Sequence, residues 1–167
     1  MAIYRVKQFI WAVTARFKPI DYELVRKYLN KNEEKLFNML SISERHHSIR
    51  VCNEALNRYE YINKDIDKDK LAKIALLHDV GKSDTTLNVI DKSILVILDK
   101  ITKGNLRKYD RNRKIDIYYN HANKSVRLLK KIDKYDIEFL EAIEKHHHKK
   151  SNSNIYLNII KESDDNS

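Results

Sequence analysis

Hydrophobic residues recur at spacings of three and four along most of the chain, which is the period of an amphipathic α-helix. Polar residues that suit helix N-caps stand before several of these segments, namely Asp21, Ser41 or Ser43, and Asp136. Gly104 stands where a helix is expected to stop. After residue 18 the pattern predicts helices over residues 21–40, 41–62, 71–80, 93–103, 118–132, 136–148 and 155–167.

Several connections interrupt this pattern, and residues 63–70, NKDIDKDK, form a polar one. Residues 105–117 are highly charged and weakly periodic, which predicts a surface loop or a frayed helix. Residues 149–154, KKSNSN, are the clearest loop in the sequence. No internal repeat and no second domain is evident.

The first 40 residues are predicted to be a helical extension packed on a core made by residues 41–167. Residues 4–18, YRVKQFIWAVTARFK, mix basic and bulky apolar residues at helical spacing. We expect them to form a helix that buries its apolar face on the core, and a helix lying at a membrane interface is the alternative. The apolar face would contain Phe9, Ile10, Val13 and Phe17.

The composition favours an all-α fold. The chain has only two glycines and one proline, and a β-rich fold would need turn residues at nearly every reversal. Its single cysteine, Cys52, rules out an internal disulfide and suits a reduced cytoplasmic compartment. No apolar run approaches the ~20 residues of a membrane-spanning helix.

The net charge of +9 suggests polyanionic partners such as nucleotides, nucleic acid or an anionic membrane. A compositional bias toward Lys, Asn and Ile explains the same excess without any such partner. A basic nucleic-acid-binding domain is one candidate class. Aromatic stacking motifs and a recognisable helix-turn-helix are missing, so nucleic acid is not the expected partner.

Residues 75–83, ALLHDVGKS, end a predicted core helix with an imidazole, a carboxylate and an ammonium. A helix end accounts for part of this run, because Gly81 stands where a left-handed cap would fall and Lys82 would face the negative end of the helix dipole. His78 and Asp79 are left without an explanation, since each is costly to bury without a partner.

The seven histidines fall in four places, at residues 46–47, 78, 121 and 146–148. Helical register with apolar neighbours turns one histidine of each group inward, whereas His46 lies about 100° from His47 and is predicted to be exposed. Asp164 follows an apolar residue at a spacing of four on the last helix. The inward histidines are His47, His78, His121 and His146.

Together with Asp79 and Asp164, these histidines give six candidate metal ligands from five helices. One tetrahedral ion needs four ligands, so six suit a site with two ions. Imidazole and carboxylate ligands favour Mn, Fe, Co, Ni or Zn, and the absence of thiolates argues against a structural zinc finger. Such a site can bind a phosphoryl oxygen, lower the pKa of a bridging water and stabilise an in-line displacement.

The order H…HD…H…H…D and its flanking residues resemble the HD-domain superfamily of metal-dependent phosphohydrolases, in particular its HDIG-like subgroup. The similarity covers about residues 44–165, and its segments are ERHHSIRV, ALLHDVGK, YYNHANKSVRLL, AIEKHHH and IIKESDD. It implies an all-α bundle of five core helices, with residues 41–167 as the HD domain. It also implies hydrolysis of phosphoester or phosphoanhydride bonds in nucleotides or related compounds, with divalent ions, two in number, of Fe, Mn, Co, Ni, Zn or Mg.

The resemblance further implies roles for individual residues. Asp79 would bridge the two ions. His147 could replace or supplement His146, and Asp165 could take the place of Asp164, since helix ends shift by a residue or two. The implied metal ligands, in motif order, are His47, His78, Asp79, His121, His146 and Asp164.

Lys82 matches the lysine after the motif doublet, which in relatives is thought to contact substrate phosphate or to assist the nucleophile. The implied catalytic residues are therefore Asp79 and Lys82, and a compact ammonium suits phosphate binding. Arg50 and Lys149 are further candidates for binding the substrate. Arg50 could instead pair with Glu54 at i+4, and Lys149 could lie in a solvated loop.

Departures from the family pattern narrow the expected substrate. The Gly-Tyr-Pro motif of cyclic-dinucleotide phosphodiesterases does not follow the paired histidines, and Ser125 stands where many relatives have glycine. Bacterial symmetrical dinucleoside tetraphosphate hydrolases share the size and motif order, and they offer the nearest specific activity. The alternative is a non-catalytic module of the same fold that senses a nucleotide.

Overall fold

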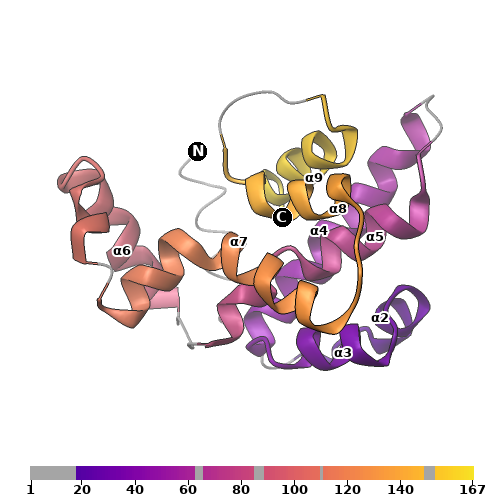
Figure 1. The fold of residues 1–167 in the computed structure, drawn as a ribbon, viewed down its shortest axis with the longest axis horizontal. Helices are drawn as coiled ribbons and strands as arrows, with labels where there is room; N and C mark the ends of the chain where they lie inside the picture. Colours follow the sequence, from indigo (N-terminus) through magenta and orange to yellow (C-terminus); the bar gives the residue numbers. More distant parts are fainter. Residues whose placement is uncertain (1–17, 63–65, 85–88, 110, 149–152) are drawn as a thin grey trace.

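The computed structural model describes residues 18–167 except 63–65, 85–88, 110 and 149–152, and these described residues form helices and connections without a strand. This confirms the predicted all-α fold. Figure 1 shows α4 and α5 side by side at the centre, α8 and α9 on one side of them, and α2 and α3 on the other. The elements are α2 (Tyr22–Tyr28), α3 (Lys31–Asn38), α4 (Ile42–Tyr61), α5 (Lys68–Leu77), the 3₁₀ helix η2 (Val80–Asp84), α6 (Val89–Ile101), the 3₁₀ helix η3 (Asn105–Tyr109), α7 (Arg113–Ile132), α8 (Ile137–Lys145) and α9 (Ile155–Asp165).

The predicted caps begin three of these helices. The Asp21 carboxylate accepts a hydrogen bond from the Leu24 amide at 3.0 Å, and Asp136 accepts one from Phe139 at 2.8 Å. Ser41, and not Ser43, caps α4, because its Oγ accepts from the Glu44 amide. Each cap satisfies an amide that would otherwise lack an intrahelical partner.

The single helix predicted over residues 21–40 was wrong, because the chain forms two helices there. Leu29 has an extended backbone that ends α2. Asn30 then begins α3 with a reciprocal capping box, in which its side chain accepts from the Glu33 amide and the Glu33 carboxylate accepts from the Asn30 amide. The apolar period continues across this break, so periodicity alone conceals it.

Other boundaries differ from the prediction too, such as the start of α6 at Val89 instead of residue 93. Residues 105–117 contain η3 and the first turn of α7, which Asn112 caps. Helix α5 ends at Leu77, before the HD pair, and η2 follows from Val80. Gly104 does end the preceding helix, and its φ of +85° is the left-handed conformation that glycine adopts without strain.

One large hydrophobic core joins α2 and α3 to α4, α5, α7, α8 and α9. Helix α5 lies at its centre and buries Leu71, Ile74, Leu76 and Leu77 completely. Residues 22–40 therefore pack on the same core as the helices that follow, while a domain boundary at residue 40 stays a prediction. The apolar face predicted over residues 4–17 lies outside the described residues.

A second, smaller cluster lies where α6 and η3 meet the first half of α7. It consists of Leu95, Leu106, Ile115 and Ile117. In Figure 1 this part of the molecule extends to the left of the main body. None of the described helices is both long enough and apolar enough to cross a lipid bilayer.

Candidate metal centre

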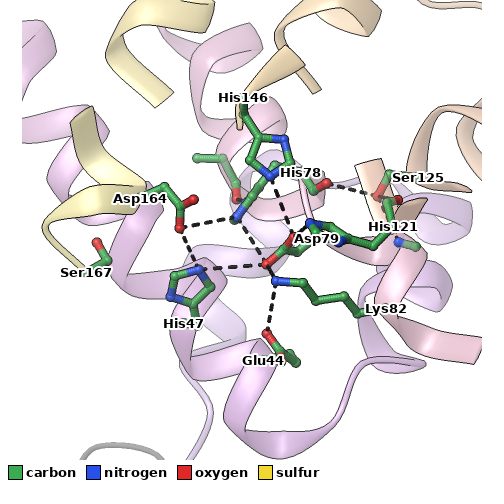
Figure 2. A network of polar contacts seen from close by, with 12 residues as sticks. Glu44, His47, His78, Asp79, Lys82, His121, Ser125, His146, Asp164 and Ser167 are labelled. Carbon is green, nitrogen blue, oxygen red and sulfur yellow. Dashed lines mark hydrogen bonds and ion pairs between the residues drawn. The ribbon is translucent and has the colours of Figure 1, made fainter. Parts of the chain in front are cut away.

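Five helices bring the predicted ligands to one buried point, shown in Figure 2. His47 lies on the second turn of α4, and His78 and Asp79 occupy the turn between α5 and η2. The remaining members come from three further helices: His121 from α7, His146 from the C-terminal end of α8 and Asp164 from the last turn of α9. The structure thus brings these six side chains together, although His121 lies in the middle of α7 and not at the start of a helix as predicted.

The sequence suggested a left-handed cap at Gly81, but this prediction was wrong. Gly81 positions the HD pair by close packing instead. In the described residues only Gly104 among the glycines has a positive φ. A Cβ atom at Gly81 would lie 2.1 Å from the His121 carbonyl oxygen and 2.6 Å from the Ser125 amide nitrogen. Only glycine therefore lets the turn after Asp79 approach the backbone of α7 this closely.

Ser125 joins the HD turn to α7, a role that the sequence did not reveal. Its hydroxyl accepts a hydrogen bond from the Gly81 amide at 2.8 Å and lies 2.9 Å from the His78 carbonyl oxygen. Ser125 is completely buried. It thereby satisfies two backbone groups of the turn and holds the HD pair against His121. A serine four residues after a histidine does not indicate in the sequence that it contacts a distant turn.

Three of the imidazoles are oriented by the backbone. Nδ1 of His78 lies 2.8 Å from the Ala75 carbonyl oxygen, that of His121 lies 2.9 Å from Ile117, and that of His146 lies 2.6 Å from Ile143. Since a carbonyl oxygen only accepts, Nδ1 must carry the proton in each ring. The lone pair of the neutral ring is then on Nε2, which is the arrangement of metal-binding histidines whose other nitrogen donates to the protein.

The Asp79 carboxylate lies between four imidazoles. Oδ2 is 3.8 Å from Nε2 of His47 and 3.4 Å from Nε2 of His78. Oδ1 is 3.4 Å from Nε2 of His121 and 3.8 Å from Nε2 of His146. These distances are too long for hydrogen bonds. They are close to the separation of about 3.4 Å that two ligand atoms have when each lies about 2.1 Å from one tetrahedral ion.

Several polar atoms of the cluster have no hydrogen-bond partner among the described residues. They are Nε2 of His78, Oδ1 of Asp79 and Nε2 of His146, all buried. An unpaired polar atom in the interior is expensive, and divalent cations at the cluster would give these atoms partners. The donor set of imidazole nitrogens and carboxylate oxygens therefore fits a divalent metal.

The cluster contains three overlapping groups of candidate ligand atoms, each within 4.8 Å of one another. One group takes Asp79 with His47 and His78, and another takes His78 with His146 and Asp164. The third consists of Asp79, His121, His146 and His147. Asp79 lies in two groups, and its two oxygens face different histidines.

A family model for the HD domain matches residues 45–166 of the chain. The chain belongs to the HD domain family. HD domains are typically metal-dependent hydrolases that bind divalent ions, and the buried cluster of this HD domain fits such a metal site. No curated protein and no solved structure gave a significant match to the chain.

The two open alternatives differ in their geometry. Asp164 faces the cluster, with Oδ1 accepting from Nε2 of His47 at 2.9 Å, whereas Asp165 is exposed. His147 stands beside His146, and its Nε2 lies 2.8 Å from Nε2 of His121. The HD domain thus places both histidines in the cluster but only one of the two aspartates.

Burial and charge divide the cluster of this HD domain into two electrostatic environments. Burial and the nearby Lys82 ammonium lower the pKa of His121 to about 3. Burial and His147 also lower the pKa of His146 well below its usual value. Burial alone would lower the pKa of His78 too, but Asp79 outweighs it and raises that pKa to about 9. Neutral imidazoles therefore face Oδ1 of Asp79, and a protonated one faces Oδ2.

Lys82 lies at the edge of the cluster. Its ammonium forms an ion pair with Oδ2 of Asp79 and lies 4.0 Å from the Glu44 carboxylate (Figure 2). The ammonium keeps the Asp79 pKa well below its usual value despite burial, which alone would raise it. Glu44 is buried one turn before His47, and the sequence reasoning missed it because it looks like an ordinary first-turn carboxylate.

The role of Arg50 and Lys149 in substrate binding stays a prediction. Arg50 lies on α4 three residues after His47 and is half-buried. The Glu54 carboxylate, its suggested partner, forms an ion pair with Arg58 at 3.0 Å. Lys149 lies outside the described residues.

Proposed function

We propose that this HD domain is a phosphohydrolase that cleaves a phosphoester or phosphoanhydride bond of a nucleotide or a small phosphorylated metabolite. The observation that carries the proposal is the buried Asp79 carboxylate, whose two oxygens face different imidazoles at 3.4–3.8 Å. This arrangement suits a carboxylate shared by two cations.

We expect two divalent ions, drawn from Fe, Mn, Co, Ni, Zn or Mg. Ions in such a pair polarise a phosphoryl oxygen and lower the pKa of a water molecule. His47, His78 and Asp164 would hold one ion with Oδ2 of Asp79, whereas the second would lie against Oδ1. Its other ligands would be His121, His146 and His147.

The side chains of the centre have separate tasks in this mechanism. Ala75, Ile117 and Ile143 accept the Nδ1 protons of three histidines and so fix the orientation of each ring. Lys82, which is 15% exposed, holds a charged ammonium at the border between the buried centre and solvent. From there it can donate hydrogen bonds to a phosphate oxygen and offset charge that develops during phosphoryl transfer.

The substrate class is supported by the family and by the size and motif order of the chain. HD domains act on small phosphorylated molecules, and dinucleoside polyphosphates are the first compounds to test. Arg50 and Lys149 remain candidates for binding the rest of such a substrate, and membership of the HDIG subgroup is part of the proposal. We expect the protein to act in the cytoplasm, where its single cysteine stays reduced.

The proposal is tested first by metal content. The protein is purified without chelator and compared with His47→Ala, His78→Ala and Asp79→Ala by elemental analysis. His46→Ala is the matched control, because His46 is the neighbour of His47 on α4 but contacts the Lys18 carbonyl oxygen at 3.2 Å. We expect the three variants to lose bound metal and the control to keep it. Full metal content in Asp79→Ala would refute the assignment.

Activity is tested by release of phosphate or nucleoside diphosphate from a library of nucleotides and dinucleoside polyphosphates, with each divalent metal in turn. We expect turnover that His78→Ala and Asp79→Ala abolish and His46→Ala retains. Tight nucleotide binding without turnover under any metal would support a sensing module and overturn the hydrolase proposal.

A further inference from the structure

An apolar stripe of four residues faces solvent along α6. Ile94, Ile97, Leu98 and Ile101 are 49%, 57%, 39% and 71% exposed. Their spacing of three and four puts them on one side of the helix. The opposite side already packs on α7 and η3, where Leu95 is buried and the Asp99 carboxylate accepts a hydrogen bond from the Tyr119 hydroxyl. Helix α6 is thus apolar on two faces, a pattern typical of helices that are covered on both.

Exposed cations surround this stripe. Residues 89–114 carry eight lysines and arginines against three aspartates, a large part of the chain's net charge of +9. Two of the aspartates are engaged, since Asp91 pairs with Lys114 at 2.7 Å and Asp99 binds Tyr119. Cations that are exposed and form no ion pair with a described residue include Lys100, Lys103, Lys108, Arg111 and Arg113.

The stripe and the cations lie in one arm of the molecule. Figure 1 shows α6 and the start of α7 at the left end, away from α8 and α9. Ile101, the most exposed residue of the stripe, leads directly into the turn that carries Lys103 and then into η3. At the end of η3, Tyr109 is 67% exposed.

We propose that this arm, formed by α6 and η3, docks on an anionic lipid surface. Aliphatic side chains of the stripe would enter the boundary between headgroups and acyl chains, and the lysines and arginines would contact anionic headgroups. An amphipathic tyrosine at the rim suits the same interface.

Other occupants fit the observations less well. A second copy would bring two cationic arms together, and four apolar residues are far fewer than the roughly 20–30 residues a side of a stable interface. A nucleic acid would leave the isoleucines and the leucine without a role, since bases stack on aromatic side chains. An anionic membrane uses both the apolar stripe and the positive charge.

Vesicle sedimentation tests this inference independently of the proposed hydrolase activity. The full chain is mixed with vesicles of phosphatidylcholine alone or with about 30% phosphatidylserine, a content that gives a negative surface potential. We expect binding to the anionic vesicles only. The double variant Ile97→Asp/Ile101→Asp should bind at least about tenfold more weakly, because it removes the apolar contact. Lys103→Glu should cost about fivefold or more, as expected for one surface cation.

The matched control is Ile137→Asp. Ile137 is 84% exposed at the start of α8, outside the arm, so its replacement should leave vesicle binding unchanged. Circular dichroism and metal content confirm that each variant is folded. No binding at low ionic strength would overturn the inference. So would binding that depends on Phe9 instead of Ile97 and Ile101, a dimer that the double variant dissociates, or binding of RNA in preference to vesicles.

Discussion

Replacement of Gly81 by alanine tests how the HD pair is held in place. The added methyl group would lie 2.1 Å from the His121 carbonyl oxygen and 2.6 Å from the Ser125 amide nitrogen. Both atoms belong to the backbone of α7, so no side-chain rotation relieves the overlap. The turn and α7 must move apart by about 1 Å or more, since carbon and oxygen normally approach to about 3.3 Å.

The expected loss in the free energy of unfolding follows from the contacts that this movement breaks. Overpacking of a tight contact costs about 1–3 kcal/mol. Separation also breaks the hydrogen bond from the Gly81 amide to Ser125 and the one from Ser125 to the His78 carbonyl oxygen. A buried amide left without a partner costs about 1–3 kcal/mol more. We therefore expect a loss of about 3 kcal/mol or more from the free energy of unfolding, a large share of a typical 5–15 kcal/mol.

Urea denaturation monitored by circular dichroism measures this loss, and calorimetric titration measures metal affinity. We expect the affinity of Gly81→Ala to fall about 10- to 100-fold, as for other changes that displace ligands indirectly. Gly104→Ala is the matched control. It is strained by about 1–2 kcal/mol because of its positive φ, but nothing lies near the added methyl group, so metal affinity should not change. Wild-type stability and metal affinity in Gly81→Ala would refute the close-packing explanation.

Three further predictions concern the metal, a buried ion pair and the cysteine. A divalent metal at about 100 times its dissociation constant should raise the melting temperature by about 5–10 °C, chelation should reverse the rise, and Asp79→Asn should abolish it. Glu33→Ala should lower the free energy of unfolding by about 2–4 kcal/mol in urea titrations, because the buried carboxylate accepts from Lys73 at 3.1 Å and from the Tyr135 hydroxyl at 3.0 Å. Burial and Asp21 raise the pKa of Cys52 to about 12, so a thiol reagent at pH 8 should label it only as fast as the protein unfolds.

Much of this fold follows from local patterns in the sequence. Caps such as Asp136 and Ser41 and the stop at Gly104 lie where the sequence indicates, because each acts on its own neighbouring residues. The break between α2 and α3 is local too, but the capping box of Asn30 and Glu33 is masked by an apolar period that runs through it. Local signals compete there, and backbone hydrogen bonding prevails over periodicity.

The ligands of the candidate site could be predicted from the sequence, but the residues that support them could not. Histidines and aspartates that are costly to bury alone must have partners, so their positions on inward faces indicate a common centre. Ser125 and Gly81 act between segments 44 residues apart, and their roles depend on how closely two helices approach. Glu44 gains its significance only from its distance to Lys82. Such long-range contacts leave no periodic trace in a single sequence.

The two oxygens of Asp79 are not equivalent in this structure, which bears on how a metal would enter. Oδ2 is next to the Lys82 ammonium and to His78, whose pKa is raised to about 9. Its negative charge is therefore already balanced by cations of the chain. Oδ1 faces His121 and His146, whose pKa values burial lowers. Nε2 of His121 lies 2.8 Å from Nε2 of His147, whereas Nε2 of His146 has no hydrogen-bond partner among the described residues. Nε2 of His146 and Oδ1 lie 3.8 Å apart, and no described residue donates a hydrogen bond to either atom. A divalent ion held by Oδ1 and His146 would supply the partner that both atoms lack, whereas binding at Oδ2 would require His78 to lose a proton and Lys82 to share the carboxylate oxygen. The Oδ1 side of the centre is accordingly the one that needs a metal ion most for its own stability.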